Sequence, residues 1–185
     1  MPELEQIAQV LDELAARLRA YAPPEPPPEP DPAKWLWPVI GIPMRITQRF
    51  NSPVNYANGK HEGIDMDCWD ETTQRLCAIV AANPGTVQVV NRWDGTRRGW
   101  QAYGNYVRVL QDDGYTVQYS HMSRIAEGLA VGVRVERGAP IGVGGNTGNS
   151  VGAHLHFDAE HPSAPPVYIF QRRCVNPTPL LPPVP

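Results

Sequence analysis

Residues 152–159 read GAHLHFDA, the stretch of the chain that says most about both fold and chemistry. Successive side chains of a β-strand point to opposite faces, so His154 and His156 would share one face while Leu155 and Phe157 share the other. The whole chain has only five histidines, and two of them fall here. The stretch therefore predicts a strand with a polar, histidine-bearing face and an apolar face that belongs to a core.

Three further runs have the same β-type composition. They are GTVQVVN at 85–91, NYVRVLQ at 105–111 and YTVQYSH at 115–121, all rich in β-branched and aromatic residues. The triplet DDG at 112–114 supplies a hairpin turn between the second and the third run. These runs predict a mainly β domain built on an antiparallel β-sheet.

In the loop-rich segment before GAHLHFDA, the glycines Gly144, Gly145 and Gly148 predict a flexible stretch.

The N-terminal part differs in composition from the rest of the chain. Residues 1–21 place apolar side chains at a heptad-like 3-4 spacing, which predicts an amphipathic helix that self-associates or docks into a larger assembly. Residues 22–34 are rich in proline and predict an extended linker. We therefore expect three segments: the helix, the linker and a catalytic-type domain over residues 35–185.

Charge and composition exclude several classes of partner. The net charge of the 185 residues is −3, which offers no broad attraction for nucleic acid or anionic lipid. No stretch is long and apolar enough to predict a membrane span, and the first residues do not resemble a secretory signal peptide. Cys68, Cys77 and Cys174 form no C-x-x-C pair, which argues against a zinc ribbon. Cys68 and Cys77 could form a disulfide or remain free thiols in the core.

The other candidate chemical groups lie in two segments upstream. KHEGIDMD at 60–67 contains His61 and Asp65, an imidazole and a carboxylate of the kind that zinc prefers, and QYSHMSRI at 118–125 contains His121 near a strand end. Each group alone could be an ordinary surface residue. Together, the three histidine-bearing segments could build one metal centre, although spacing alone does not decide which histidine of the H-x-H pair would be the ligand.

Taken together, the motifs HEGIDMD, YGNYVRV, YSHMSRI and GAHLHFDA, with the glycine-rich lead into the last, resemble the lysostaphin-type zinc endopeptidases. The resemblance runs from about residue 47 to residue 158 and extends weakly to VNPTPLL at 175–181. It implies the lysostaphin-like peptidase fold. It leaves the N-terminal helix and the linker unexplained.

Residue by residue, the resemblance implies that His61, Asp65 and His156 hold a Zn²⁺ ion, while His121 and His154 act beside it as general acid–base groups. Three protein ligands leave one tetrahedral position for water, which is the arrangement of a catalytic zinc site. Tyr56 is a further candidate, as a donor to the tetrahedral intermediate.

The implied activity is zinc-dependent hydrolysis of peptide bonds in bacterial peptidoglycan, in its cross-links or stem peptides. The short domain with its helical appendage suits a bacteriophage lysin or a virion-associated hydrolase that acts on the cell wall. The alternative is a catalytically weak protein that binds peptidoglycan or serves as a structural component of a phage tail.

Overall fold

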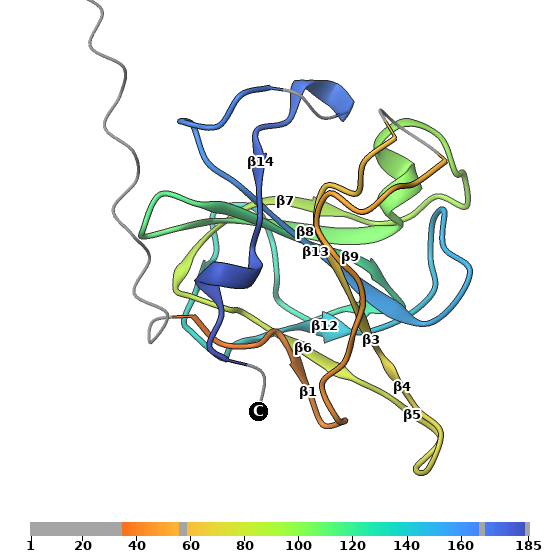
Figure 1. Cartoon of the computed structure of the whole chain (residues 1–185). Coiled ribbons are helices and arrows are strands. Elements are labelled where there is room, and N and C mark those ends of the chain that lie inside the picture. The colour runs from red at the N-terminus through yellow and green to blue at the C-terminus, as the bar shows by residue number, and fades with distance from the viewer. Residues whose placement is uncertain (1–34, 56–58, 167–168, 184–185) are drawn as a thin grey trace, which may run out of the picture.

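The computed structural model describes residues 35–55, 59–166 and 169–183 (Figure 1). The amphipathic helix over 1–21 and the linker over 22–34 lie outside the described residues, so both stay predictions, as does self-association through the helix. Among the residues that are described, no helix is long and apolar enough to cross a membrane.

A large, twisted antiparallel sheet dominates the fold. Its strands follow the order β11-β7-β8-β9-β13-β3-β2, and β14 pairs with β13 beside that path. The strands of this sheet are β2 (Ile46–Gln48), β3 (Ile64–Asp67), β7 (Gly85–Asn91), β8 (Asn105–Gln111), β9 (Thr116–Met122), β11 (Arg134–Val135), β13 (His154–Glu160) and β14 (Cys174–Val175).

A smaller antiparallel sheet packs below the large one in the view of Figure 1, in the order β1-β6-β12-β10. Its strands are β1 (Val39–Ile40), β6 (Ala78–Val80), β10 (Arg124–Ile125) and β12 (Pro140–Val143). A separate hairpin is formed by β4 (Trp69–Asp70) and β5 (Arg75–Leu76). Three short 3-10 helices complete the described part: η1 (Gly99–Tyr103), η2 (Ile169–Gln171) and η3 (Thr178–Leu180).

The hydrophobic core joins side chains from both sheets into one cluster. Phe157 on β13 lies with its ring centre 5.3 Å from that of Tyr119 on β9 and 6.2 Å from that of Trp35. Leu155 and Phe157 are fully buried in this cluster, whereas Ile79 and Ile141 enter it from the small sheet. The apolar face predicted for GAHLHFDA is therefore confirmed.

The sequence periodicity located the long strands well. β7 and β8 begin and end where the runs at 85–91 and 105–111 predicted, and β13 covers most of the predicted stretch 152–159 and ends one residue later. β9 starts at Thr116 and continues to Met122, so His121 lies inside the strand, one residue before its end. The mainly antiparallel β fold is likewise as predicted.

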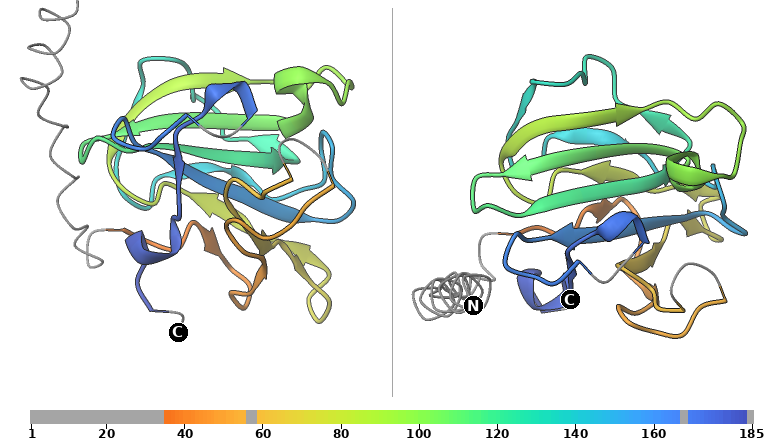
Figure 2. Two further views of the ribbon diagram at one scale, coloured as in Figure 1. Left: turned by 45° about the horizontal axis from the view of Figure 1, so that its top comes forward. Right: turned by 90° about the horizontal axis from the view of Figure 1, so that it is seen from above.

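Three connections gather at one end of the large sheet. They are the segment that leads into β3, the β7–β8 connection that contains η1, and residues 144–153 before β13 (Figures 1 and 2). Two of these connections lead into the histidine-bearing strands β3 and β13, and the β7–β8 connection contacts the segment before β13 through the hydrogen bond from Asn149 N to the carbonyl oxygen of Ala102. Candidate chemical groups from distant parts of the sequence can therefore meet at this end of the sheet.

Candidate metal centre

The pairing of β3 with β13 brings Asp65 and His156 together. The two residues are directly opposite each other in the antiparallel register, so their side chains project from the same face of the sheet. His156 Nδ1 lies 2.9 Å from Asp65 Oδ1. His61, just before β3, places its Nε2 atom 3.0 Å from His156 Nδ1 and 3.1 Å from Asp65 Oδ1. Three potential ligand atoms thus form a compact triangle.

The outer nitrogens of the two imidazoles show why this triangle suits a cation. His61 Nδ1 lies 3.1 Å from the carbonyl oxygen of Arg49, and His156 Nε2 lies 3.3 Å from Asp158 Oδ2. If each outer nitrogen donates its proton to that oxygen, the inner nitrogen is left with a lone pair. Two nitrogen lone pairs and a carboxylate then face one point, an arrangement that a shared positive charge stabilises. His61, Asp65 and His156 could hold a metal ion.

Two further histidines border the triangle. The rings of His121 and His154 lie 4.8 Å apart between centroids, and the ring of His121 lies 6.0 Å from that of His156. His154 Nε2 is 3.9 Å from Asp65 Oδ1. The structure therefore brings all five predicted site residues together. Tyr56, the sixth candidate, lies outside the described residues.

Backbone carbonyls hold both bordering rings. Nδ1 of His121 lies 2.7 Å from the carbonyl oxygen of Thr147, and Nδ1 of His154 lies 2.9 Å from that of Gly152. Ser150 Oγ is a second neighbour of His154 Nδ1, at 3.2 Å. Because a carbonyl can only accept, Nδ1 of each ring carries the proton and Nε2 is left able to accept one.

His121 reaches the site through a local departure from regular strand geometry. Its neighbour Ser120 pairs with His156 and so shares the face of His156, which would turn His121 toward the core by simple alternation. The β8–β9 register shifts at this point, between Asn105 and Val107, and His121 has a φ of 62°. A bulge of this kind re-aims a side chain, and here it turns the imidazole toward the other histidines.

The electrostatics of the centre favour positive charge. Burial raises the pKa of Asp65, but hydrogen bonds from His156 and His61 outweigh it and hold the pKa well below its usual range. Burial opposes the charged form of His156, but the carboxylates of Asp158 and Asp65 outweigh it and raise the pKa of the imidazole to about 10. The carboxylates that favour a proton on His156 would equally favour a metal cation.

His121 has the opposite tendency. Burial, with smaller contributions from His154 and His156, lowers its pKa to about 3. A neutral His121 can accept a proton at physiological pH, whereas a protonated one could not.

The comparison with protein families decides which class of protein carries this site. A model of Peptidase family M23 matches residues 59–176, a span that contains His61, Asp65, His121, His154 and His156. The chain belongs to peptidase family M23. The resemblance to lysostaphin-type peptidases inferred from the motifs is thereby confirmed.

Curated relatives of this M23 domain are longer proteins. An uncharacterized metalloprotease of Buchnera aphidicola subsp. Baizongia pistaciae is 30% identical over 122 residues, which cover 62% of this chain and 28% of that protein. The peptidoglycan DD-endopeptidase ShyA of Vibrio cholerae is 42% identical over 55 residues, 30% of this chain and 12% of ShyA. The chain thus spans at most 28% of the length of these two relatives.

Solved M23 structures share the fold. The catalytic domain of the prophage-encoded M23 protein EnpA from Enterococcus faecalis, in a mutant form, is 26% identical with a TM-score of 0.56, covering 76% of this chain and 94% of that chain. The catalytic domain of lysostaphin from Staphylococcus simulans is 22% identical, also with a TM-score of 0.56, covering 74% of this chain and 90% of its own. The lysostaphin likeness shows the fold alone.

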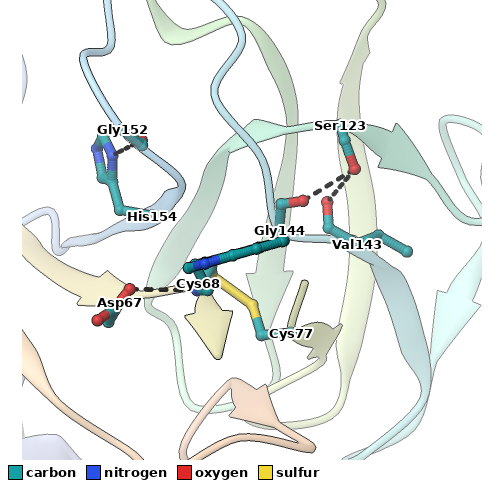
Figure 3. Close-up of a disulfide and its surroundings, with 9 residues drawn as sticks. Asp67, Cys68, Cys77, Ser123, Val143, Gly144, Gly152 and His154 are labelled. Carbon is teal, nitrogen blue, oxygen red and sulfur yellow. Dashed lines mark hydrogen bonds between the residues drawn. A yellow bond between two sulfur atoms is a disulfide. The ribbon is translucent and has the colours of Figure 1, made fainter. Parts of the chain in front are cut away.

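A disulfide lies next to the segment that leads into His154. The sequence left open whether Cys68 and Cys77 are bonded, and in the structure they form a disulfide whose two residues are fully buried (Figure 3). Gly144 crosses it so closely that an added Cβ would lie 2.5 Å from either sulfur. Cys68 N donates to the carbonyl oxygen of Ala153, 3.2 Å away. The disulfide therefore supports both β3, which carries Asp65, and the segment before His154.

Gly144, Gly145 and Gly148 are closely packed, which corrects the expectation of a flexible stretch. An added Cβ at Gly145 would lie 2.3 Å from the backbone nitrogen of Ser123. One at Gly148 would lie 2.4 Å from the carbonyl oxygen of Ala102, in the β7–β8 connection. One at Gly104 would lie 2.3 Å from Thr147 Oγ1. These glycines permit contact between neighbouring backbones.

Gly63 fits the same pattern. It lies just before β3, and an added Cβ there would lie 2.5 Å from the carbonyl oxygen of Phe157. The fifth histidine, His161, lies outside the motif segments and is half-buried, with its Nδ1 atom 2.8 Å from Ser163 Oγ.

Sequence reasoning missed a buried polar cluster beneath the triangle. Asp158 and Arg172 are almost completely buried, as is Glu62, which accepts a hydrogen bond from Tyr103. Burial is the largest influence on Glu62 and raises its pKa. Strand alternation could have found Asp158, since it lies two residues after His156 on the same face. Arg172 had no local signal, because it comes from the segment between η2 and β14.

Proposed function

We propose that this M23 domain is a zinc-dependent endopeptidase that hydrolyses peptide bonds in bacterial peptidoglycan, in its cross-links or stem peptides. The observation that carries the proposal is the convergence of His61 Nε2, Asp65 Oδ1 and His156 Nδ1 within 2.9–3.1 Å of one another. The kinship with ShyA, a peptidoglycan DD-endopeptidase, supports the substrate class.

The donor set fits zinc. Two imidazoles and one carboxylate are borderline ligands of the kind found in catalytic zinc sites, and three protein ligands leave a fourth position open. Zinc bound there would supply a Lewis acid that polarises the scissile carbonyl and acidifies the attacking water. The chain's own task is to hold the three ligand atoms in place, which the pairing of Asp65 with His156 and the contact of His61 with the Arg49 carbonyl do.

His121 and His154 are suited to move the protons. Each has Nδ1 held by a backbone carbonyl, so Nε2 can accept a proton from the attacking water and return it to the leaving nitrogen. In its protonated form either ring could also stabilise the negative charge that develops on the carbonyl oxygen. We propose both residues as general acid–base groups without dividing the roles between them.

Digestion of purified peptidoglycan tests the proposal. The full chain is incubated with walls that contain glycine bridges and, separately, with walls that contain diaminopimelate-type cross-links, and new amino termini are identified by mass spectrometry. We expect new termini from at least one wall type, their loss after chelation, and recovery on addition of zinc. Binding to both walls with no new terminus would contradict the proposal and favour the catalytically weak alternative.

The setting is a proposal of the same kind. We propose that the domain acts on the bacterial cell wall as part of a phage lysin or a virion-associated hydrolase. The likeness to EnpA, which is encoded by a prophage, supports this setting.

A further inference from the structure

The nitrogen of His156 that faces away from the triangle has a buried carboxylate as its neighbour, although the two atoms are not aligned as a hydrogen bond in this structure. Nε2 lies 3.3 Å from Oδ2 of Asp158, whose side chain is completely buried. Asp158 is on the same face of β13 as His156, two residues further along the strand. The imidazole thus lies between the ligand triangle on one side and a carboxylate on the other.

Arg172 holds that carboxylate in turn. Its guanidinium donates through Nη1 to Asp158 Oδ2 at 3.2 Å and through Nη2 to Asp158 Oδ1, which is a two-pronged contact. Arg172 is only 3% exposed. It reaches this position from the C-terminal segment, directly after Phe170 and Gln171, both of which have positive φ. The chain therefore adopts an uncommon backbone conformation next to this buried arginine.

The remaining contacts of Arg172 show that it is fully engaged. The guanidinium donates to Glu160 Oε1 at 2.8 Å and 3.0 Å, and to the hydroxyl oxygen of Tyr103 at 3.3 Å. Its Nη1 also lies 3.6 Å from Glu62 Oε1. One guanidinium thus contacts three carboxylates beneath the metal triangle, of which Asp158 and Glu62 are buried.

Stability alone is a poor explanation for this arrangement. Taking charged groups out of water costs free energy that their mutual attraction often fails to recover, so a buried ion pair is weak evidence of a stabilising role. A metal-ligating histidine, by contrast, usually donates its second ring nitrogen to a carboxylate or carbonyl, which fixes the tautomer and the ring orientation and makes the ligand more basic. The Asp158 carboxylate, 3.3 Å from His156 Nε2, is placed where a small rotation of the ring would complete that second pattern.

We propose that Asp158 and Arg172 are positioning residues of the metal centre: Asp158 accepts the Nε2 proton of His156, and Arg172 holds the Asp158 carboxylate in place. The inference rests on the proposed function, since it concerns how tightly the same site binds zinc. It also gives the C-terminal segment, which carries none of the motif residues, a direct part in the metal centre.

Zinc affinity of the purified full chain, measured by competition with a chelator, tests the inference. We expect Asp158→Asn to weaken zinc binding by about 10–100-fold, since the amide keeps the shape but loses the charge. Arg172→Met should weaken it as well, and Arg172→Lys less, because lysine keeps the charge without the two-pronged contact. Arg108→Met is the matched control: Arg108 pairs with Glu160 rather than with Asp158, so its loss should leave zinc affinity unchanged.

A double variant keeps the test decisive. Arg172→Met leaves a buried carboxylate unpaired and can unfold the chain, whereas Asp158→Asn combined with Arg172→Met removes both charges. If Arg172 acts through Asp158, the double variant should bind zinc no more weakly than Asp158→Asn alone. If the double variant instead binds zinc more weakly than Asp158→Asn, by the product of the two single losses, Arg172 acts by another route and that part of the inference is overturned.

The failures of the two proposals are distinguishable. A wild-type chain without zinc affinity would contradict the proposed function, and the inference with it. Wild-type zinc affinity in folded Asp158→Asn would contradict the inference alone. As a second readout, cobalt replaces zinc in the folded proteins. A visible absorption band that differs from the wild-type band in Asp158→Asn, but not in Arg108→Met, would support the inference. An unaltered band would contradict it, because a merely structural role would not change the ligand field.

Discussion

The two faces of β13 are buried to nearly the same degree by opposite means. On one face, Leu155 and Phe157 are fully buried among apolar side chains from both sheets. On the other face, Asp158 is also fully buried and His156 is 5% exposed, but their neighbours are a carboxylate, imidazoles and a guanidinium. One strand thus carries a hydrophobic core on one side and a charged interior on the other.

The difference teaches that exposure alone does not identify a core residue. Apolar side chains need only complementary volume around them, so neighbours can be exchanged if the volume is kept. Buried polar side chains need particular partners at particular atoms, since an unpaired buried charge is costly. Substitutions on the two faces should therefore fail differently, the first in stability and the second in metal binding or turnover.

The largest effect should follow removal of a ligand from the polar face. His61→Ala, Asp65→Ala and His156→Ala should each release the metal and abolish hydrolysis, because each removes one corner of the triangle. Elemental analysis of the zinc content of each purified variant checks this, with the wild-type chain expected to hold about one zinc ion. Full zinc occupancy in His156→Ala would mean that His154 is the ligand of the H-x-H pair.

A smaller loss should follow removal of the bordering histidines. His121→Ala and His154→Ala should keep the metal and lower the rate of wall hydrolysis by about 10²–10⁴-fold, which is typical of lost general acid–base help. Turnover assays at matched zinc content check this. A variant that lyses walls at the wild-type rate would not have lost a catalytic group.

The apolar face should respond in stability instead. Leu155 lies between His154 and His156 in sequence but points into the core, so Leu155→Ala should lower the free energy of unfolding by about 2–5 kcal/mol. Urea denaturation measures the change, and Leu110→Ala, at a position that is 39% exposed, serves as the control. Zinc content of the folded Leu155→Ala protein should match the wild type. Loss of zinc without loss of stability would contradict the division between the faces.

The smallest effect should come from an ion pair at the surface. Arg134 donates to both carboxylate oxygens of Asp112 at 2.6 Å, much as Arg172 does to Asp158, but its side chain is 49% exposed. Arg134→Met should therefore leave the free energy of unfolding nearly unchanged, because solvent screens the pair, and leave zinc affinity unaltered. A change as large as that of Leu155→Ala would show that exposure does not weaken this pair.

Local patterning explains what the sequence could predict. Alternation located β7, β8 and β13, and the motif positions located the five residues that meet at one end of the sheet. Alternation alone predicts the wrong face for His121, which faces the site because of a bulge and a positive φ. Side-chain pairing was equally hidden: spacing does not tell whether Cys68 and Cys77, nine residues apart, are bonded, and nothing around Arg172 indicates that it contacts Asp158.

The backbone contact between Gly104 and Thr147 bears on how this domain could be engineered. The β7–β8 connection and the segment before β13 touch main chain to main chain, with Asn149 N donating to the carbonyl oxygen of Ala102 at 2.7 Å. A loop transplanted from another peptidase into one of these positions would pack against the other loop, whose backbone fits the original sequence. Exchanges intended to alter bond preference should therefore swap both loops as a matched set, with the glycines at the crossing retained.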